Sequence, residues 1–211
     1  MSTLLLRLAA PLQAWGAESK FERRGTGREP TKSGVIGMLA AALGRQRDES
    51  LDDLSSLKFG VRVDKPGQIM KDFHTAESTK QTYVTTRYYI EDAIFLVGLE
   101  GDEEFLRILE AAVLSPLFPL FLGRRSCPPT GRISLGLREK SLRDALQEEP
   151  SLVESHGGSP IMLYMDTDEV GFYRQRDLPI SFNPQHRKFA YRYICSEILS
   201  STSHDSFEEV D

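Results

Sequence analysis

The sequence of 211 residues lacks the features that mark several protein classes. It has only two cysteines, Cys127 and Cys195, and neither has a Cys or His neighbour at zinc-ligand spacing, so we expect no disulfide framework and no metal site. No apolar run approaches the roughly 18 residues that a membrane span needs, and residues 1–4 lack the basic start of a secretory signal. We therefore expect a cytoplasmic protein with no membrane partner. Its 40% hydrophobic and 27% charged residues are typical of a globular protein with a packed core.

Basic residues are present but unevenly distributed in this chain of net charge −5. Residues 1–47 hold eight basic side chains against three acidic ones, and the densest stretch contains Lys20, Arg23, Arg24, Arg28 and Lys32. Glycines and a proline interrupt this stretch, so we predict a basic loop rather than a helix. Such a loop suits phosphate binding, but a run of charges is equally typical of a solvated surface, and both interpretations stay open.

The hydrophobic pattern predicts an α+β fold. The expected elements are strands over residues 3–8, 57–63, 90–99 and 117–122, and helices over residues 31–43 and 101–116. Thr31 or Ser33 can cap the first helix, and Gly44 is well placed to end it. The order strand, helix, strand, strand, helix, strand is that of a ferredoxin-like (RRM-like) domain, which we expect over residues 1–135.

Two regions lack the pattern of a core. Residues 71–89 are rich in threonine and poor in large apolar side chains, so we expect them to project from the core. After residue 135 the chain shows a short helix over 141–147, a loop over 148–160 and short strands over 161–165 and 191–194. These predict a short β extension over residues 136–199 that packs on the first domain. Residues 200–211 are serine-rich, with four acidic residues and no Lys or Arg, and are expected to be disordered.

Three blocks of sequence follow one another in an order that is more specific than any single glycine-rich loop. They are residues 6–16 (LRLAAPLQAWG), residues 24–37, which include Arg24-Gly25-Thr26 and PTKSGVIG, and residues 119–128 (PLFLGRRSCP). Together these blocks resemble the CasD family, the 5′-handle-binding subunit of the type I-E CRISPR surveillance complex, Cascade. Arg176-Asp177-Leu178-Pro179, with the later Arg187 and Arg192, is similar to the family's C-terminal segment.

The resemblance implies a non-catalytic RNA-binding subunit, active in antiviral defence, that caps the 5′ handle of a CRISPR RNA (crRNA). It also implies a ferredoxin-like domain with a β-hairpin thumb near residues 68–90, and no cofactor. The implied partners are the crRNA, the CasC backbone subunit, the CasA large subunit and other Cascade subunits. Cleavage of the precursor RNA would belong to a different subunit, CasE.

The residues themselves also favour single-stranded RNA as the ligand. Loops such as Gly123-Arg124-Arg125 let the backbone approach a sugar–phosphate chain while guanidinium groups hold phosphates, and thumb aromatics can stack on unpaired bases. Lys32, in the first helical turn, would oppose the helix dipole unless a phosphate lay nearby. The bland alternatives are surface salt bridges for the two arginines and burial for Tyr88 and Tyr89. The candidate RNA-binding residues are Arg23, Arg24, Lys32, Ser33, His74, Lys80, Tyr83, Arg87, Arg124, Arg125 and Arg132.

Two catalytic functions can be weighed on the same residues. The stretch PTKSG resembles half of a phosphate-binding loop, but no residues complete the pattern GxxxxGK[ST], which excludes a nucleotide-triphosphate site. A metal-independent endoribonuclease that processes CRISPR repeat RNA stays open as the alternative, because His74 lies near Lys71, Lys80 and Tyr83. We nevertheless expect no catalytic residue.

Overall fold

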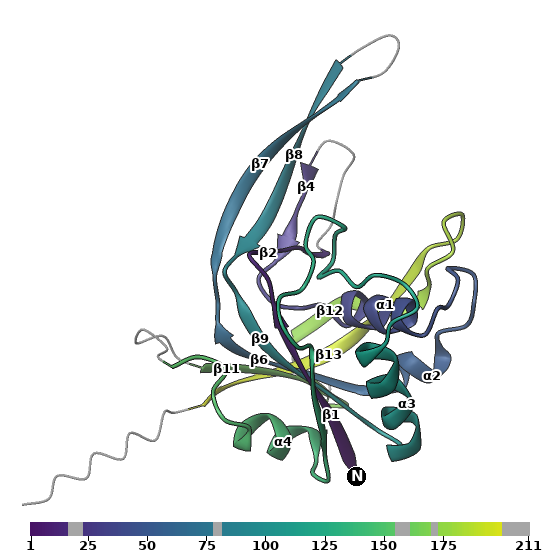
Figure 1. The fold of residues 1–211 in the computed structure, drawn as a ribbon, viewed down its shortest axis with the longest axis vertical. Coiled ribbons are helices and arrows are strands. Elements are labelled where there is room, and N and C mark those ends of the chain that lie inside the picture. Colours follow the sequence, from purple (N-terminus) through teal and green to yellow (C-terminus); the bar gives the residue numbers. More distant parts are fainter. Residues whose placement is uncertain (17–22, 78–81, 155–160, 170–172, 200–211) are drawn as a thin grey trace, which may run out of the picture.

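Seven antiparallel strands form the central sheet of the computed structural model, which describes residues 1–16, 23–77, 82–154, 161–169 and 173–199 (Figure 1). Across the sheet the order is β10 (Ser134–Arg138), β1 (Ser2–Ala9), β9 (Ile94–Gly101), β6 (Lys58–Lys65), β11 (Ile161–Thr167), β13 (Lys188–Leu199) and β12 (Tyr173–Ser181). The first strand therefore lies inside the sheet, with Leu4 paired to Leu99 on one side and to Leu137 on the other.

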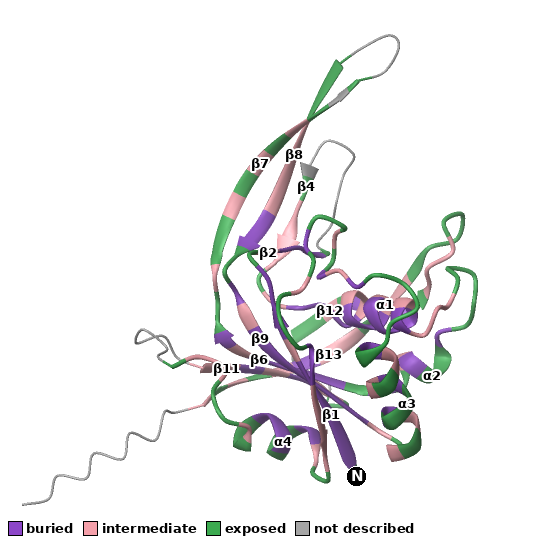
Figure 2. Ribbon diagram, in the orientation of Figure 1, coloured by how far each residue is buried: buried purple, intermediate pink, exposed green. Residues whose placement is uncertain are grey.

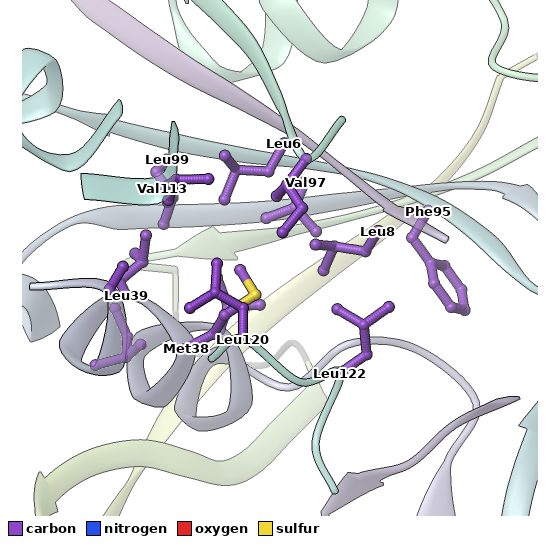
Figure 3. Close-up of a cluster of buried hydrophobic side chains, with 14 of the residues drawn as sticks. Leu6, Leu8, Met38, Leu39, Phe95, Val97, Leu99, Val113, Leu120 and Leu122 are labelled. Carbon is purple, nitrogen blue, oxygen red and sulfur yellow. The ribbon is translucent and has the colours of Figure 1, made fainter. Parts of the chain in front are cut away.

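Helices cover both faces of this sheet and divide the core into two clusters. Helices α1 (Lys32–Ala42) and α3 (Glu103–Leu114) cover the face to which Leu4, Leu6 and Leu8 of β1 contribute (Figure 3). Helix α4 (Leu142–Glu148) covers the opposite face, where Leu5 packs with Leu96. The apolar residues of β1 thus alternate between the two clusters, as the two-residue period of a strand requires. The short helix α2 (Asp52–Ser55) follows α1 along the chain.

The prediction of a strand over residues 117–122 is wrong. No strand lies between α3 and β10; instead, a loop runs through residues 115–133, with Leu120 and Leu122 buried in the core. Prolines at 116 and 119 restrict the backbone and remove N–H donors, so this apolar run fills the core without joining a ladder. The strand that follows α3 is β10, which pairs with β1.

A long hairpin, β7 (Gln68–Glu77) and β8 (Thr82–Glu91), projects from the sheet between β6 and β9 (Figure 1). Most of its described length is exposed or half-buried, whereas Tyr89 and Ile90 at its base are buried (Figure 2). The expectation that residues 71–89 stay outside the core is therefore wrong at Tyr89. Strand β2 (Leu12–Gln13) pairs with this base, and β4 (Arg23–Arg24) runs parallel to β8 higher on the arm.

The C-terminal strands extend the same sheet rather than forming a separate layer. Strand β11 pairs with β6, β13 pairs with β11, and β12 forms the sheet edge. Strand β12 was not expected from the sequence, because Asp177 and Pro179 interrupt the alternation of a half-buried strand. A separate two-stranded sheet joins β3 (Trp15–Gly16) to β5 (Thr26–Gly27). None of the described helices is long and apolar enough to cross a membrane.

The loop before β10 depends on glycine at position 123. Gly123 has φ +90°, and a Cβ atom there would lie 1.6 Å from the carbonyl oxygen of Ala14. Gly131 in the same loop also has a positive φ, +71°, but the nearest atom to a Cβ there is Arg7 Nη1 at 3.4 Å. The two glycines therefore share the backbone conformation but not the close approach.

We expect Gly123→Ala to lower the free energy of unfolding more than Gly131→Ala does. Both substitutions carry the cost of a left-handed conformation, about 1–2 kcal/mol. Gly123→Ala adds the cost of overpacking against Ala14, about 1–3 kcal/mol. Urea denaturation of the two variants measures the difference, and equal losses would show that the loop can move away from Ala14.

Candidate nucleic-acid interface

One face of the β7–β8 hairpin carries three of the predicted RNA-binding residues. Tyr83 and Arg87 lie on the same face of β8 because they are separated by an even number of residues. His74 of β7 pairs with Thr85, which lies between them on that face. His74 Nε2 lies 2.6 Å from Asp72 Oδ2, an ion pair when the imidazole is protonated. We call this surface the inner hairpin face.

Strand β4 brings the basic loop beside this face. Arg24 is exposed and lies opposite Arg87 in the parallel pairing of β4 with β8. The backbone of Arg23 pairs with Thr86, but the side chain of Arg23 and the whole of Lys80 lie outside the described part of the chain. The pairing places cations from two distant segments next to each other, where they attract an anion and repel one another.

Arg124 fastens β4 and β8 together at the base of the hairpin. Its Nη1 donates to the carbonyl oxygen of Tyr88 at 3.0 Å, and its Nη2 donates to the carbonyl oxygens of Arg24 at 2.9 Å and Gly25 at 3.1 Å. The guanidinium also lies 4.8 Å from the ring centre of Tyr89. Phosphate contact by Arg124 therefore stays a prediction, but carbonyl oxygens already accept three hydrogen bonds from its Nη1 and Nη2.

Tyr89 connects the hairpin base to the same loop. Its hydroxyl lies 3.4 Å from Ser126 Oγ. Burial raises the pKa of Tyr89, but hydrogen bonds from Ser126, Arg124 and Arg87 outweigh burial, and the pKa lies below its ordinary value. Burial raises the pKa of the neighbouring Cys127 thiol, which suits a packed residue rather than a reactive one. Tyr89 and Ser126 thus belong to the framework of the interface.

The remaining predicted residues lie in different places. Arg125 is exposed beside Arg124, and its side chain has no ion-pair partner among the described residues. Ser33 lies in the first turn of α1, with its hydroxyl 3.5 Å from Thr31 Oγ1. Arg132 is exposed just before β10, and no hydrogen bond in the described part of the chain joins it to the hairpin. Of these, Arg125 lies closest to the interface along the chain, because it follows Arg124, which binds β4 and β8.

Lys32 is buried and paired with a carboxylate, which argues against its prediction as a phosphate-binding residue. It begins α1, as expected, but only 4% of its surface is exposed. Its Nζ donates to the carbonyl oxygen of Leu57 at 2.6 Å and pairs with Asp166 Oδ2 at 2.9 Å. Asp177 accepts a hydrogen bond from its backbone N–H at 2.8 Å. These carboxylates, rather than a phosphate, compensate for a cation at a helix N-terminus.

Arg192 completes this buried ionic cluster, which sequence reasoning missed. Its Nη1 contacts Asp166 Oδ1 at 2.5 Å, and its Nε contacts Asp177 Oδ1 at 2.6 Å. Asp166 also accepts from the backbone N–H of Phe59 at 3.1 Å. Only the presence of charged residues within apolar strand patterns could have indicated such a cluster from the sequence, and that signal does not specify partners.

The interface suits a flexible anionic chain. Arg24, Arg87 and Arg125 supply cations, while Tyr83 supplies an exposed ring on the same arm. Guanidinium groups hold phosphates, and an exposed ring stacks on an unpaired base. Among the residues that the structure describes, no three His, Cys, Asp or Glu side chains cluster as metal ligands would.

Comparisons with known proteins agree with one another. A family model described as CRISPR-associated protein (Cas_Cas5) matches residues 3–195. The CRISPR system Cascade subunit CasD of Escherichia coli (strain K12) is 40% identical over 163 residues, which cover 66% of this chain and 73% of that protein.

Two solved structures are similar over nearly the whole chain. A crystal structure of a Cas protein is 41% identical, covers 93% of this chain and 94% of that chain, and has a TM-score of 0.77. A chain of a CRISPR RNA-guided surveillance complex is 33% identical, covers 93% of this chain and 89% of that chain, and has a TM-score of 0.79.

We expect Lys32→Gln to destabilise the protein by about 3–5 kcal/mol, because it leaves buried carboxylates without their cation. Lys140→Gln is the matched control, since Lys140 and its partner Glu148 are both exposed and such pairs contribute about 0–1 kcal/mol. Chemical denaturation monitored by circular dichroism gives both values. Unchanged stability of Lys32→Gln together with weaker RNA binding would restore Lys32 to the interface.

Proposed function

The chain belongs to the Cas5 family of CRISPR-associated proteins, and from this premise we propose that it is a subunit of a type I-E Cascade complex that binds and caps the 5′ handle of the crRNA. We also assign the ferredoxin-like fold to its N-terminal part. The strand order β10-β1-β9-β6, with α1 and α3 as the connecting helices, supports that assignment.

The inner hairpin face is the observation that carries the handle proposal. It presents Tyr83 and Arg87 along an arm that projects from the core, with Arg24 beside it. The Nε of Arg87 is buried and has no hydrogen-bond partner among the described residues. A buried donor without a partner is unfavourable, so a rotation of the Arg87 side chain that turns Nε toward an RNA oxygen would lower its free energy.

The handle is single-stranded in this proposal. Unpaired bases can be splayed apart and stacked on side chains, whereas a duplex hides its base faces. Arg124 contributes indirectly by holding β4 against β8, so that Arg24 stays beside Arg87. We propose that Arg125, the next residue, contacts a phosphate of the handle, because its charge is exposed and has no ion-pair partner among the described residues.

The proposed partners are the crRNA, the CasC backbone subunit, the CasA large subunit and the remaining Cascade subunits. Similarity to a chain of a CRISPR RNA-guided surveillance complex supports an assembled role. The outer edge of β7 has no strand partner in the described residues, so an adjacent subunit could cover it on assembly.

We propose a binding role rather than a catalytic one. The ribonuclease site weighed from the sequence would need a lysine beside His74, but Lys71 lies on the opposite face of β7, with its Nζ 4.8 Å from the ring centre of Phe73. His74 is paired with Asp72 instead. Lys80, the other cation considered for that site, lies outside the described residues.

Incubating the protein with labelled repeat RNA in EDTA separates the two functions. We expect intact RNA for both the native chain and His74→Ala, because binding alone leaves the phosphodiester bonds unchanged. Specific cleavage by the native chain that His74→Ala abolishes would establish the nuclease and overturn the binding-only role.

Arg87→Gln and Arg125→Ala should each weaken binding to an oligoribonucleotide that carries the handle by about 1–3 kcal/mol. Arg107→Gln on α3 is the charge-matched control, and we expect it to bind like the native chain. Fluorescence anisotropy at several salt concentrations measures the affinities, and the salt dependence should be shallower for the two interface variants. Equal affinity of all three variants would count against this surface.

Trimming the hairpin tests its role in assembly. Replacing residues 74–85 with Asn-Gly keeps the pair Phe73–Thr86 next to a two-residue turn and leaves the buried base intact. We expect this variant to retain its melting temperature within a few degrees but to fail to join Cascade on the RNA, as read by native mass spectrometry. Normal incorporation of the variant into Cascade would show that assembly does not need the outer part of the hairpin.

A further inference from the structure

Strands β12 and β13 carry a second group of arginines and aromatic rings, separate from the hairpin. The guanidinium of Arg174 lies 4.4 Å from the ring centre of Tyr191 and 5.7 Å from that of Tyr193. Arg174 pairs with Tyr193 across the two strands, so all three side chains share one face of the sheet. Tyr191 is 55% exposed and Arg174 is exposed. We call these three residues the edge patch.

The edge patch lies on the α4 face of the sheet, beyond the reach of the helix. Cys195, two residues after Tyr193, packs against the cluster that contains Leu142 and Leu146 of α4. Arg143 of α4 reaches Glu197 of β13 at 2.7 Å, which marks the side of the patch nearest the helix. Past that ion pair, Tyr193 is half-buried and Tyr191 is exposed. The patch is therefore an open part of the sheet surface.

The segment that carries the patch is basic within a chain of net charge −5. Residues 173–193 hold five basic residues and one acidic residue, Asp177, whose carboxylate is already paired with Arg192 in the buried ionic cluster. The other four cations have no acidic partner in the described part of the chain: Arg174, Arg176, Arg187 and Lys188. Four cations of the sheet edge are thus without an ion-pair partner among the described residues, and Asp168 and Glu169, which follow Thr167 opposite Tyr193, bring negative charge to the other side of the patch.

We propose that the edge patch is a second binding surface for single-stranded nucleic acid. The exposed ring of Tyr191, the half-buried ring of Tyr193 and a guanidinium plane, on one sheet face, offer stacking positions for unpaired bases, and the cations of the same segment offset phosphate charge. Double-stranded nucleic acid hides its base faces and cannot use the rings in this way. This surface shares no residue with the inner hairpin face and does not depend on the handle proposal.

Photo-cross-linking separates this surface from the hairpin. The full-length protein is irradiated with 12-nucleotide 5-bromouridine RNA or with the matching 5-bromodeoxyuridine DNA, and cross-linked peptides are identified by mass spectrometry. We expect cross-links at Tyr191 or Tyr193, and which oligonucleotide forms them tells whether the bound strand is RNA or DNA. Cross-links confined to the hairpin, or none with either oligonucleotide, would overturn the proposal.

Variants at Tyr191 supply the quantitative test. Tyr191→Leu should raise the oligonucleotide concentration for half-maximal cross-linking at Tyr193 about 5- to 150-fold, which corresponds to a stacking contribution of about 1–3 kcal/mol per base. Tyr191→Phe keeps the ring and should behave like the native chain. Phe118→Leu, an exposed aromatic after α3, is the matched control and should have no effect. Equal half-maximal concentrations for Tyr191→Leu and Tyr191→Phe would show that the ring only packs against Arg174.

Discussion

The buried ionic cluster of Lys32, Asp166, Arg192 and Asp177 joins the start of α1 to three C-terminal strands. Each charge compensates for its neighbours in a largely buried region, so losing one member leaves the others unpaired at a cost of several kcal/mol. The cluster also fixes the position of α1, and the interface depends on that helix. A Cβ atom on Gly34 would lie 2.9 Å from the ring of Trp15, so the first turn of α1 packs directly on that indole.

From Trp15 the same constraint extends to the basic loop. The backbone N–H of Trp15 donates to Thr26 Oγ1 at 2.8 Å. Thr26 directly follows Gly25, whose carbonyl oxygen accepts a hydrogen bond from Arg124. Arg124 in turn holds β4 beside β8. A path of direct contacts therefore leads from the ionic cluster to the exposed cations of the hairpin. Rigid support of this kind lowers the entropy that the cations lose when they bind a ligand.

Local signals in the sequence predicted the elements whose stability is local. Thr31 caps α1 and Asp102 caps α3, as their positions before apolar periodic segments indicate. The threonine-rich segment forms the β7–β8 hairpin. The sequence did not indicate long-range partners: Lys32 was predicted to meet a phosphate at the start of a helix, yet its carboxylate partner Asp166 lies 134 residues away. Arg124 likewise donates to the carbonyl oxygens of Tyr88 and Arg24, and the sequence around Arg124 does not indicate either partner. No periodicity or spacing encodes such pairs.

The interior position of β1 has a consequence for how the chain folds during synthesis. Its apolar residues leave the ribosome before those of its strand partners β9 and β10, the latter at Ser134–Arg138. Until those segments are made, Leu4, Leu5, Leu6 and Leu8 have no sheet to enter and stay exposed to other chains. A topology that depends so much on distant pairings also folds more slowly than one built from local contacts. The order of translation thus leaves β1 in need of protection by a chaperone until β9 and β10 have been made.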